Sequence, residues 1–192
     1  MTLGKVTGND GTTFLTDASA ASITLTDISL WVGVGGSIND NGTVRNVTNP
    51  DTFSDDTVTN GTLGFSGQVT TLLMASVKDG VTASYLGVEL SGLTATLVGL
   101  ESVIDFGAWG VSVQVNKVSP ATGTKLNWGG WTKTSGIDLP AFTAALNETI
   151  DFHADGDVVF NALSGVVVGK GSFDMTLGKV TGNDGTTFLT DA

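Results

Sequence analysis

The chain contains no cysteine, only three prolines and a single histidine among its 192 residues. Without cysteine, neither a disulfide framework nor a thiolate metal site can form. The lone histidine, His153, has no second histidine or thiolate with which to complete a transition-metal site. We therefore expect His153 to be an ordinary strand-end residue and not a ligand or a general base.

Positive charge and glutamate are also scarce. There are 8 Lys and Arg residues against 19 Asp and Glu residues, which gives a formal net charge of −11. This balance lacks the cationic surface that nucleic acids and anionic membranes require, so we expect neither as a partner. Glu89, Glu101 and Glu148 are too scattered to form a pair of catalytic carboxylates. Since no nucleophile with a base is visible either, the sequence predicts no catalytic residue and no enzyme.

Glycine and small β-forming residues are abundant instead. The chain has 27 glycines and 40% hydrophobic residues, together with many Thr, Val, Asn and Asp. Threonine and valine favour strands, whereas glycine, asparagine and aspartate favour tight turns. The apolar content is enough for a sizeable core, so a folded all-β protein is expected and disorder is not.

The two ends of the sequence are copies of each other. Residues 1–18 and residues 175–192 both read MTLGKVTGNDGTTFLTDA, which sets a period of 174 residues. Residues 1–174 are expected to be one full repeat period, with an arbitrary boundary that cuts a strand. Residues 175–192 are expected to begin the next identical repeat. Because Met175 lies inside a repeat, we interpret Met1 as a repeat residue too, so a missing signal peptide is uninformative.

Apolar and polar residues alternate over unusually long stretches. From Leu163 to Leu177 the odd positions are apolar or glycine, which predicts one long half-buried strand. The alternation changes phase near Asp27 and near Gly92, as it does at a bulge that bends a sheet. Turns are predicted at residues 78–80 and 155–157, and residues 140–149 could form a helical turn.

These patterns predict an all-β fold of long, mainly antiparallel strands in a curled sheet or sandwich that continues between tandem repeats. Short predicted links favour antiparallel neighbours, because parallel crossovers need more chain. A tighter β-solenoid with short rungs is the alternative architecture.

Calcium is the one cofactor that the sequence suggests, because calcium takes clustered carboxylate, amide and backbone oxygens in turns. Asp155 and Asp157 are the first candidates, followed by Asn9, Asp10 and Asp40. Asn, Asp and Gly also populate tight turns for backbone reasons alone, so a purely structural role is the stronger alternative.

Two indoles flank a glycine pair in the run LNWGGW. Trp128 and Trp131 could stack against a sugar ring, which would make them ligand-binding residues of a carbohydrate-binding adhesin. The alternative is that both rings close one end of the β core, because tryptophan is usually covered. The covered arrangement is the favoured expectation.

The chain resembles the giant tandem-repeat surface proteins of bacteria, of the cadherin-like or RTX-associated adhesin type. The similar runs are SLWVGVGG, TKLNWGGW followed by GIDLP, and DFHADGDVVF followed by GVVVGKGSFDMTLGKV. The resemblance covers nearly the whole period, and it lies in the general sequence pattern and not in a specific motif. It implies export, extension from the cell surface, cell contact and often calcium binding.

The function we expect is structural, namely a repeat of an extracellular surface or fibre protein that acts as a spacer or adhesin stalk. One alternative is a module that binds carbohydrate or another cell. The other is a filament subunit that self-assembles by strand complementation. The expected partners are neighbouring identical repeats or copies of the chain, with a glycan or a cell surface as a further candidate.

Overall fold

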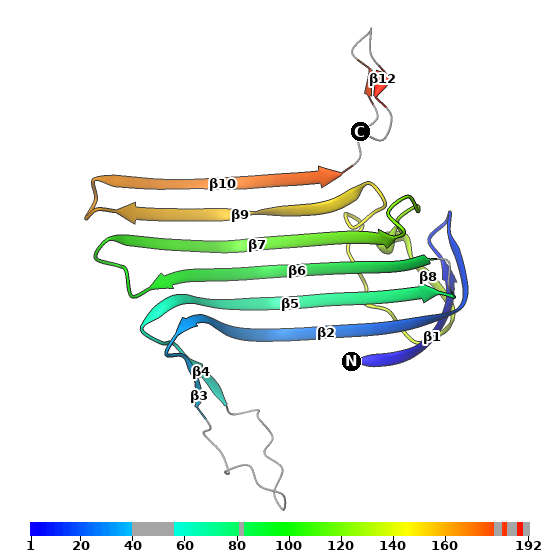
Figure 1. Cartoon of the computed structure of the whole chain (residues 1–192), viewed down its shortest axis with the longest axis horizontal. Helices are drawn as coiled ribbons and strands as arrows, with labels where there is room; N and C mark the ends of the chain where they lie inside the picture. Colours follow the sequence, from blue (N-terminus) through cyan, green and yellow to red (C-terminus); the bar gives the residue numbers. More distant parts are fainter. Residues whose placement is uncertain (40–55, 81–82, 179–181, 184–187, 190–192) are drawn as a thin grey trace, which may run out of the picture.

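An open antiparallel sheet of eight strands forms the body of the protein (Figure 1). The structure is a computed structural model and describes residues 1–39, 56–80, 83–178, 182–183 and 188–189. The strand order is β10-β9-β7-β6-β5-β2-β1-β8. These strands are β1 (Thr2–Asn9), β2 (Phe14–Val34), β5 (Leu63–Asp79), β6 (Ala83–Val98), β7 (Ile104–Ser119), β8 (Thr132–Gly136), β9 (Ile150–Ala162) and β10 (Val167–Gly178).

Among the described residues, two pairs of short strands lie outside this sheet, and one 3₁₀ turn is present. Strands β3 (Ser37–Asn39) and β4 (Thr57–Thr59) form one antiparallel pair, while β11 (Gly182–Asn183) and β12 (Phe188–Leu189) form the other. The 3₁₀ turn η1 spans Trp128–Gly130. Within the described part of the chain, no helix is long and apolar enough to cross a membrane.

The predicted all-β architecture with long antiparallel strands is confirmed. Strand β2 runs for 21 residues and β5 for 17 residues, far longer than a solenoid rung. Every pairing in the eight-stranded sheet is antiparallel. The solenoid alternative is therefore wrong, because each strand bonds to neighbours across one broad sheet.

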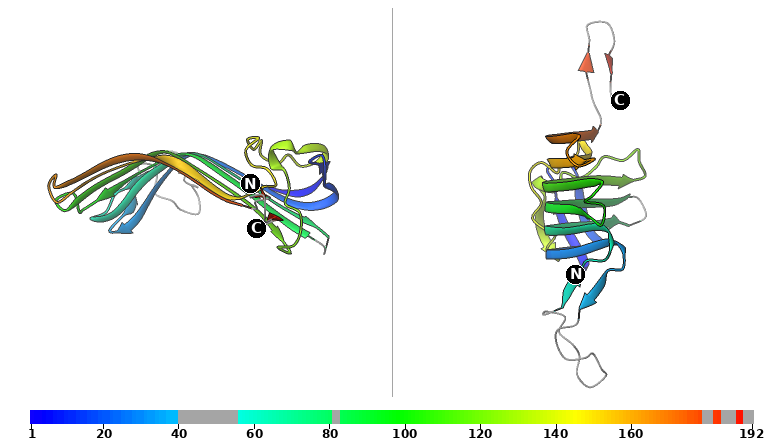
Figure 2. Two further views of the ribbon diagram at one scale, coloured as in Figure 1. Left: turned by 90° about the horizontal axis from the view of Figure 1, so that it is seen from above. Right: turned by 90° about the vertical axis from the view of Figure 1, so that its left-hand side faces the viewer.

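The covering segment, residues 120–149, folds over one face of the sheet at one end (Figure 2). It contains η1 and β8, and the main core lies beneath it. The core residues from the sheet are Val6, Leu15, Ala18, Ala20, Ala75, Val77 and Tyr85, and those from the covering segment are Leu126, Trp128, Phe142 and Leu146. Burial of these side chains on both sides holds the covering segment against the sheet.

The opposite end of the sheet is a single layer. Apolar side chains of neighbouring strands lie next to one another there. Phe65 and Phe106 are an example, and their rings meet edge to face with centroids 6.2 Å apart. Several apolar side chains there remain open, such as Val32 at 64% and Val168 at 66% exposure. The prediction that one face of β10 is buried is wrong for this structure, because β10 is an edge strand and Phe173 is exposed.

A line of irregular residues crosses the middle of the sheet. Asp27 on β2 has φ 54°, Gly92 on β6 has φ 67° and Gly110 on β7 has φ 62°. These are left-handed backbone conformations, which interrupt the alternation of side chains and bend a strand. The predicted phase changes near Asp27 and Gly92 are thus confirmed, and Figure 2 shows that the sheet curves along its strands.

Three local predictions are wrong. Residues 155–157 lie inside β9, where Gly156 pairs with Phe173, and do not form a turn. The strand predicted from Leu163 begins at Val167, because Leu163, Ser164 and Gly165 all have positive φ and form the β9–β10 turn. Residues 140–149 form turns and no helix, and the Thr143 hydroxyl of this segment accepts a hydrogen bond from Gln114 of the sheet.

Candidate functional site

The residues first proposed for calcium lie on the β9–β10 hairpin. Asp155 and Asp174 are directly opposite each other, and the His153 imidazole lies beside both, with Nε2 3.1 Å from Asp174 Oδ1 and Nδ1 3.7 Å from Asp155 Oδ1. Ser172 Oγ donates a hydrogen bond to Asp157 Oδ1 at 2.6 Å. No group of three or more His, Asp or Glu side chains in the described residues has metal-binding geometry. Calcium binding at Asp155 and Asp157 stays a prediction.

Asp10 and Asn9 belong to the β1–β2 turn, and their oxygens already accept hydrogen bonds. Asp10 Oδ1 accepts from the backbone N–H groups of Thr12 and Thr13, at 2.9 and 2.6 Å. Asp10 Oδ2 accepts from the Asn127 N–H of the covering segment at 2.8 Å, and Asn9 Oδ1 accepts from Gly11. Asp10 therefore ties the turn to the covering segment, while Asp40 lies outside the described residues.

The pKa of the Asp10 carboxyl is lowered below its ordinary value of 3.8. Burial by itself raises this pKa, but the hydrogen bonds from Thr13, Asn127 and Thr12 stabilise the charged form more strongly. A depressed folded-state pKa means that the ionised group stabilises the fold. This contribution is complete above the unfolded-state pKa and is lost as the pH falls through the folded-state pKa.

We expect Asp10→Asn to lower the free energy of unfolding by about 1–3 kcal/mol at pH 7, because a charged acceptor for several donors is lost. The loss should shrink as the pH is lowered from 3.8, since the wild-type carboxyl then also becomes neutral. Urea unfolding at pH 7 and pH 3 measures both values. Asp17→Asn is the control, because this carboxylate of the same hairpin is 76% exposed. An equal loss at both pH values would contradict the assigned role.

Trp128 and Trp131, the proposed ligand-binding pair, have different environments. Trp128 is only 2% exposed; its ring centroid lies 5.4 Å from that of Phe142, and the ring packs flat over Gly87. Trp131 is half-buried over Gly8 and borders a shallow hollow of about 270 Å³ that also contains Lys133 and Asp138. Of these two residues, Trp131 is the one whose indole a ligand could reach.

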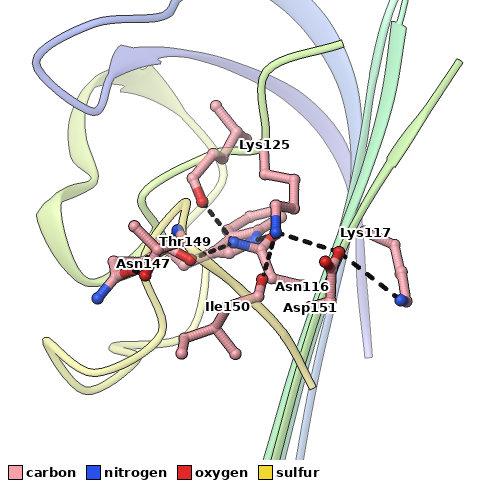
Figure 3. Close-up of polar contacts among 9 residues, drawn as sticks. Asn116, Lys117, Lys125, Asn147, Thr149, Ile150 and Asp151 are labelled. Atoms are coloured by element: carbon pink, nitrogen blue, oxygen red, sulfur yellow. Dashed lines mark hydrogen bonds and ion pairs between the residues drawn. The ribbon is translucent and has the colours of Figure 1, made fainter. Parts of the chain in front are cut away.

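A polar cluster beneath the covering segment was not identified from the sequence (Figure 3). The Asn116 side chain is fully buried; its Nδ2 donates to the carbonyls of Leu126 and Asn147, both at 2.7 Å, and its Oδ1 accepts from Trp128 Nε1 at 3.0 Å. Lys125, only 6% exposed, donates to the Ile150 carbonyl and lies 3.1 Å from Asp151. All polar atoms named here have protein partners, so the cluster is built to hold the covering segment.

A second attachment joins the covering segment to the middle of the sheet. Glu89 Oε2 accepts hydrogen bonds from the Thr143 backbone N–H at 2.9 Å and from its hydroxyl at 3.1 Å. Gln114, the neighbour of Glu89 on the next strand, donates from Nε2 to the same hydroxyl at 3.1 Å. The only glutamate in the buried part of the sheet thus serves the fold in this structure.

The most distinctive surface is a pair of open sheet edges. Strand β10 is bonded to β9 on one side and has no described strand on the other. Strand β2 is bonded to β5 from Ser19 to Val34, but β1 covers its other edge only up to Ser22. Open ladder edges present unpaired N–H and C=O groups that favour addition of another strand. We treat these two edges as the candidate functional site.

The duplicated segments support this choice. Gly8 pairs with Leu15 and Asn9 with Phe14 in the first copy. In the second copy, Gly182 pairs with Leu189 and Asn183 with Phe188, which is the same register one period later. The paired residues of the first copy belong to the eight-stranded sheet. In the second copy, residues 175–178 form the end of β10 in that sheet, whereas β11 and β12 form a separate strand pair outside it (Figure 1).

Comparison with known proteins adds no assignment. A scan against protein-family models finds no matching family, a search of curated proteins finds no similar sequence, and a search of solved structures finds no similar fold.

Proposed function

We propose that this chain is a structural repeat of an extracellular bacterial surface or fibre protein, in which identical copies join to form a spacer or adhesin stalk. The observation that carries the proposal is that residues 1–18 and 175–192 are identical in sequence, and that the two residue pairs described in both copies have the same register. A protein that repeats a unit without change in sequence gains length, because each copy can contact the next in the same way.

The chemistry of the chain fits this role. A net charge of −11 keeps an extended array soluble and limits non-specific association. The resemblance to giant bacterial surface proteins suggests export and placement at the cell surface. The partners in this proposal are neighbouring copies, with the terminal parts of a longer array available for contact with a glycan or another cell.

The test is small-angle X-ray scattering on chains of two, four and six periods. We expect the maximum dimension to increase by a constant amount for each added period, while the cross-section stays unchanged. Independent units on flexible linkers would instead give an increase that falls off with the number of periods, roughly as a square root. That result would overturn the spacer proposal.

Three further measurements address the filament alternative, the cofactor and the surface location. Concentration-dependent growth of the 192-residue chain in sedimentation velocity would favour the filament alternative, in which separate chains exchange strands. Melting temperatures with calcium and with a chelator test the predicted cation, since a ligand that binds only the folded state raises the melting temperature.

Protease treatment of intact source cells tests the surface location.

A further inference from the structure

We propose that neighbouring repeats share one continuous β-sheet, in which the open edge of β10 in one unit pairs with the open edge of β2 in the next unit. This proposal rests on the proposed function, because it specifies how identical copies are joined. The occupant of each open edge is therefore a second copy of this chain.

The end of β10 and the start of β1 are equivalent strand positions in the repeat. Thr176–Gly178 at the end of β10 has the same sequence as Thr2–Gly4 at the start of β1, one period earlier. Both segments lie in strands that run in the same direction across the sheet (Figure 1). In an array, the end of β10 in one unit is therefore the beginning of β1 in the next.

Strands β9 and β8 pair with different parts of this shared strand. Strand β9 pairs with β10 as far as Gly178, which corresponds to Gly4. On β1, the edge equivalent to the one that β9 occupies on β10 is bonded to β8, but only from Val6 onward. The Lys5 carbonyl, which lies between Gly4 and Val6, accepts a hydrogen bond from the Ile137 N–H. One edge of a single strand can thus bind β9 of its own unit and then β8 of the next.

Side chains at equivalent positions of β10 and β1 lie on the same face of the sheet. Thr176 lies opposite His153, whose row continues through Gln114 to Glu89, the side chain bound by Thr143 of the covering segment. Gly4, two residues after the equivalent of Thr176, faces Ile137 of the same covering segment. Directly paired residues share a face, so the even-numbered positions point the same way in both copies. The two strands can therefore be joined without a one-residue shift of register, which would move every side chain to the opposite face of the sheet.

The register of the new ladder follows from the existing one. Thr2 pairs with Ser22, and Thr176 is the equivalent of Thr2 one period later. Two residues earlier, Asp174 then lies opposite Thr24 of the next unit, and Phe173 lies opposite Leu25 of the next unit. Phe173 is 37% exposed and Leu25 is 47% exposed in the present structure, and this pairing would cover both.

This joint also fixes the direction of growth. There are six strand-to-strand steps from β1 to β10, and neighbouring strands lie about 4.8 Å apart. Each unit should therefore lengthen the array by about 29 Å, perpendicular to the strands. Growth along the strands would give a larger step, because β2 alone, with 21 residues, spans about 70 Å.

The test uses disulfide formation in a chain of two periods, whose natural sequence contains no cysteine. One variant carries Asp174→Cys in the first unit with Thr24→Cys in the second, and another carries Phe173→Cys with Leu25→Cys. Adjacent antiparallel pairs alternate between wide and narrow, so at least one variant places its thiols at a narrow pair. The matched control joins Asp174→Cys to Thr26→Cys, which is displaced by two residues and out of disulfide range.

Two internal pairs confirm that the strand keeps its other neighbours. Thr2→Cys with Ser22→Cys reports the β1–β2 ladder, and Asp157→Cys with Ser172→Cys reports the β9–β10 ladder. We expect both internal pairs and at least one unit-to-unit pair to oxidise in air, while the displaced control stays reduced. Oxidised internal pairs with reduced unit-to-unit pairs would overturn the shared sheet.

The two proposals fail separately. If the length of the array grows linearly but the unit-to-unit disulfides do not form, the spacer stands and the shared sheet is wrong. If the disulfides form but the length does not grow linearly, the joint is correct and the spacer is wrong. A step far from 29 Å per unit in the same scattering series would also contradict sheet growth across the strands.

Discussion

Asn116→Leu should lower the free energy of unfolding by about 3–5 kcal/mol, because it leaves the Leu126 carbonyl and the Trp128 indole N–H buried without partners and removes one of two donors to the Asn147 carbonyl. The Asn116 amide binds the carbonyls of Leu126 and Asn147 and the indole N–H of Trp128, and its exposure is 0%. Leucine fills a similar space but can neither donate nor accept a hydrogen bond. Urea unfolding followed by tryptophan fluorescence measures the loss.

Asn161→Leu is the matched control for this substitution. Asn161 also lies in a strand of the main sheet, but its side chain is exposed, so we expect a change within about 0.5 kcal/mol. A small loss for Asn116→Leu, comparable to that of the control, would mean that the covering segment is held by apolar burial alone. The polar cluster would then contribute nothing to the attachment of this segment.

Much of the fold could be predicted because alternation reports directly on strands. The phase changes near Asp27 and Gly92 indicated where the sheet bends, and both residues have left-handed backbone conformations. The turn prediction failed at Gly156, because a glycine between two aspartates is typical of a turn but also permits close approach inside a strand. A Cβ at Gly156 would lie 2.7 Å from the Val111 side chain, a contact that only the folded sheet creates.

The covering segment could not be predicted from periodicity. Its contacts to the sheet span long sequence separations, such as Asp10 with Asn127 and Glu89 with Thr143. Polar residues in such a segment are typical of a surface loop, and no local pattern marks Lys125 or Asn116 as buried. The one available signal was indirect, namely that a loop containing the run LNWGGW has indoles to cover.

Two parts of the molecule therefore have different roles in the proposed array. The covered end contains the main core and the polar cluster, and it gives each unit stability of its own. The single-layer end has exposed apolar side chains and the longest open edges. A unit that completes its ladder with a copy of itself would protect these edges, which otherwise favour aggregation.

The second large effect is expected at Trp128, where Trp128→Ala should lower the free energy of unfolding by about 3–5 kcal/mol. The ring packs between Gly87 and Phe142, and its Nε1 binds Asn116. Its removal leaves a cavity and a buried amide oxygen without a donor. Because the two residues are in contact, combining this substitution with Asn116→Leu should cost less than the sum of the single losses.

Trp131→Ala is the comparison that separates structure from binding. Its ring is half-buried, so we expect a smaller loss of about 1–2 kcal/mol, measured in the same urea unfolding experiment. Stacking against a sugar needs an accessible aromatic face, which Trp128 lacks at 2% exposure. If the chain binds a glycan in an array screen, Trp131→Ala should abolish the signal while the protein stays folded. A glycan signal that survives Trp131→Ala would place binding elsewhere and leave both indoles as parts of the covered end.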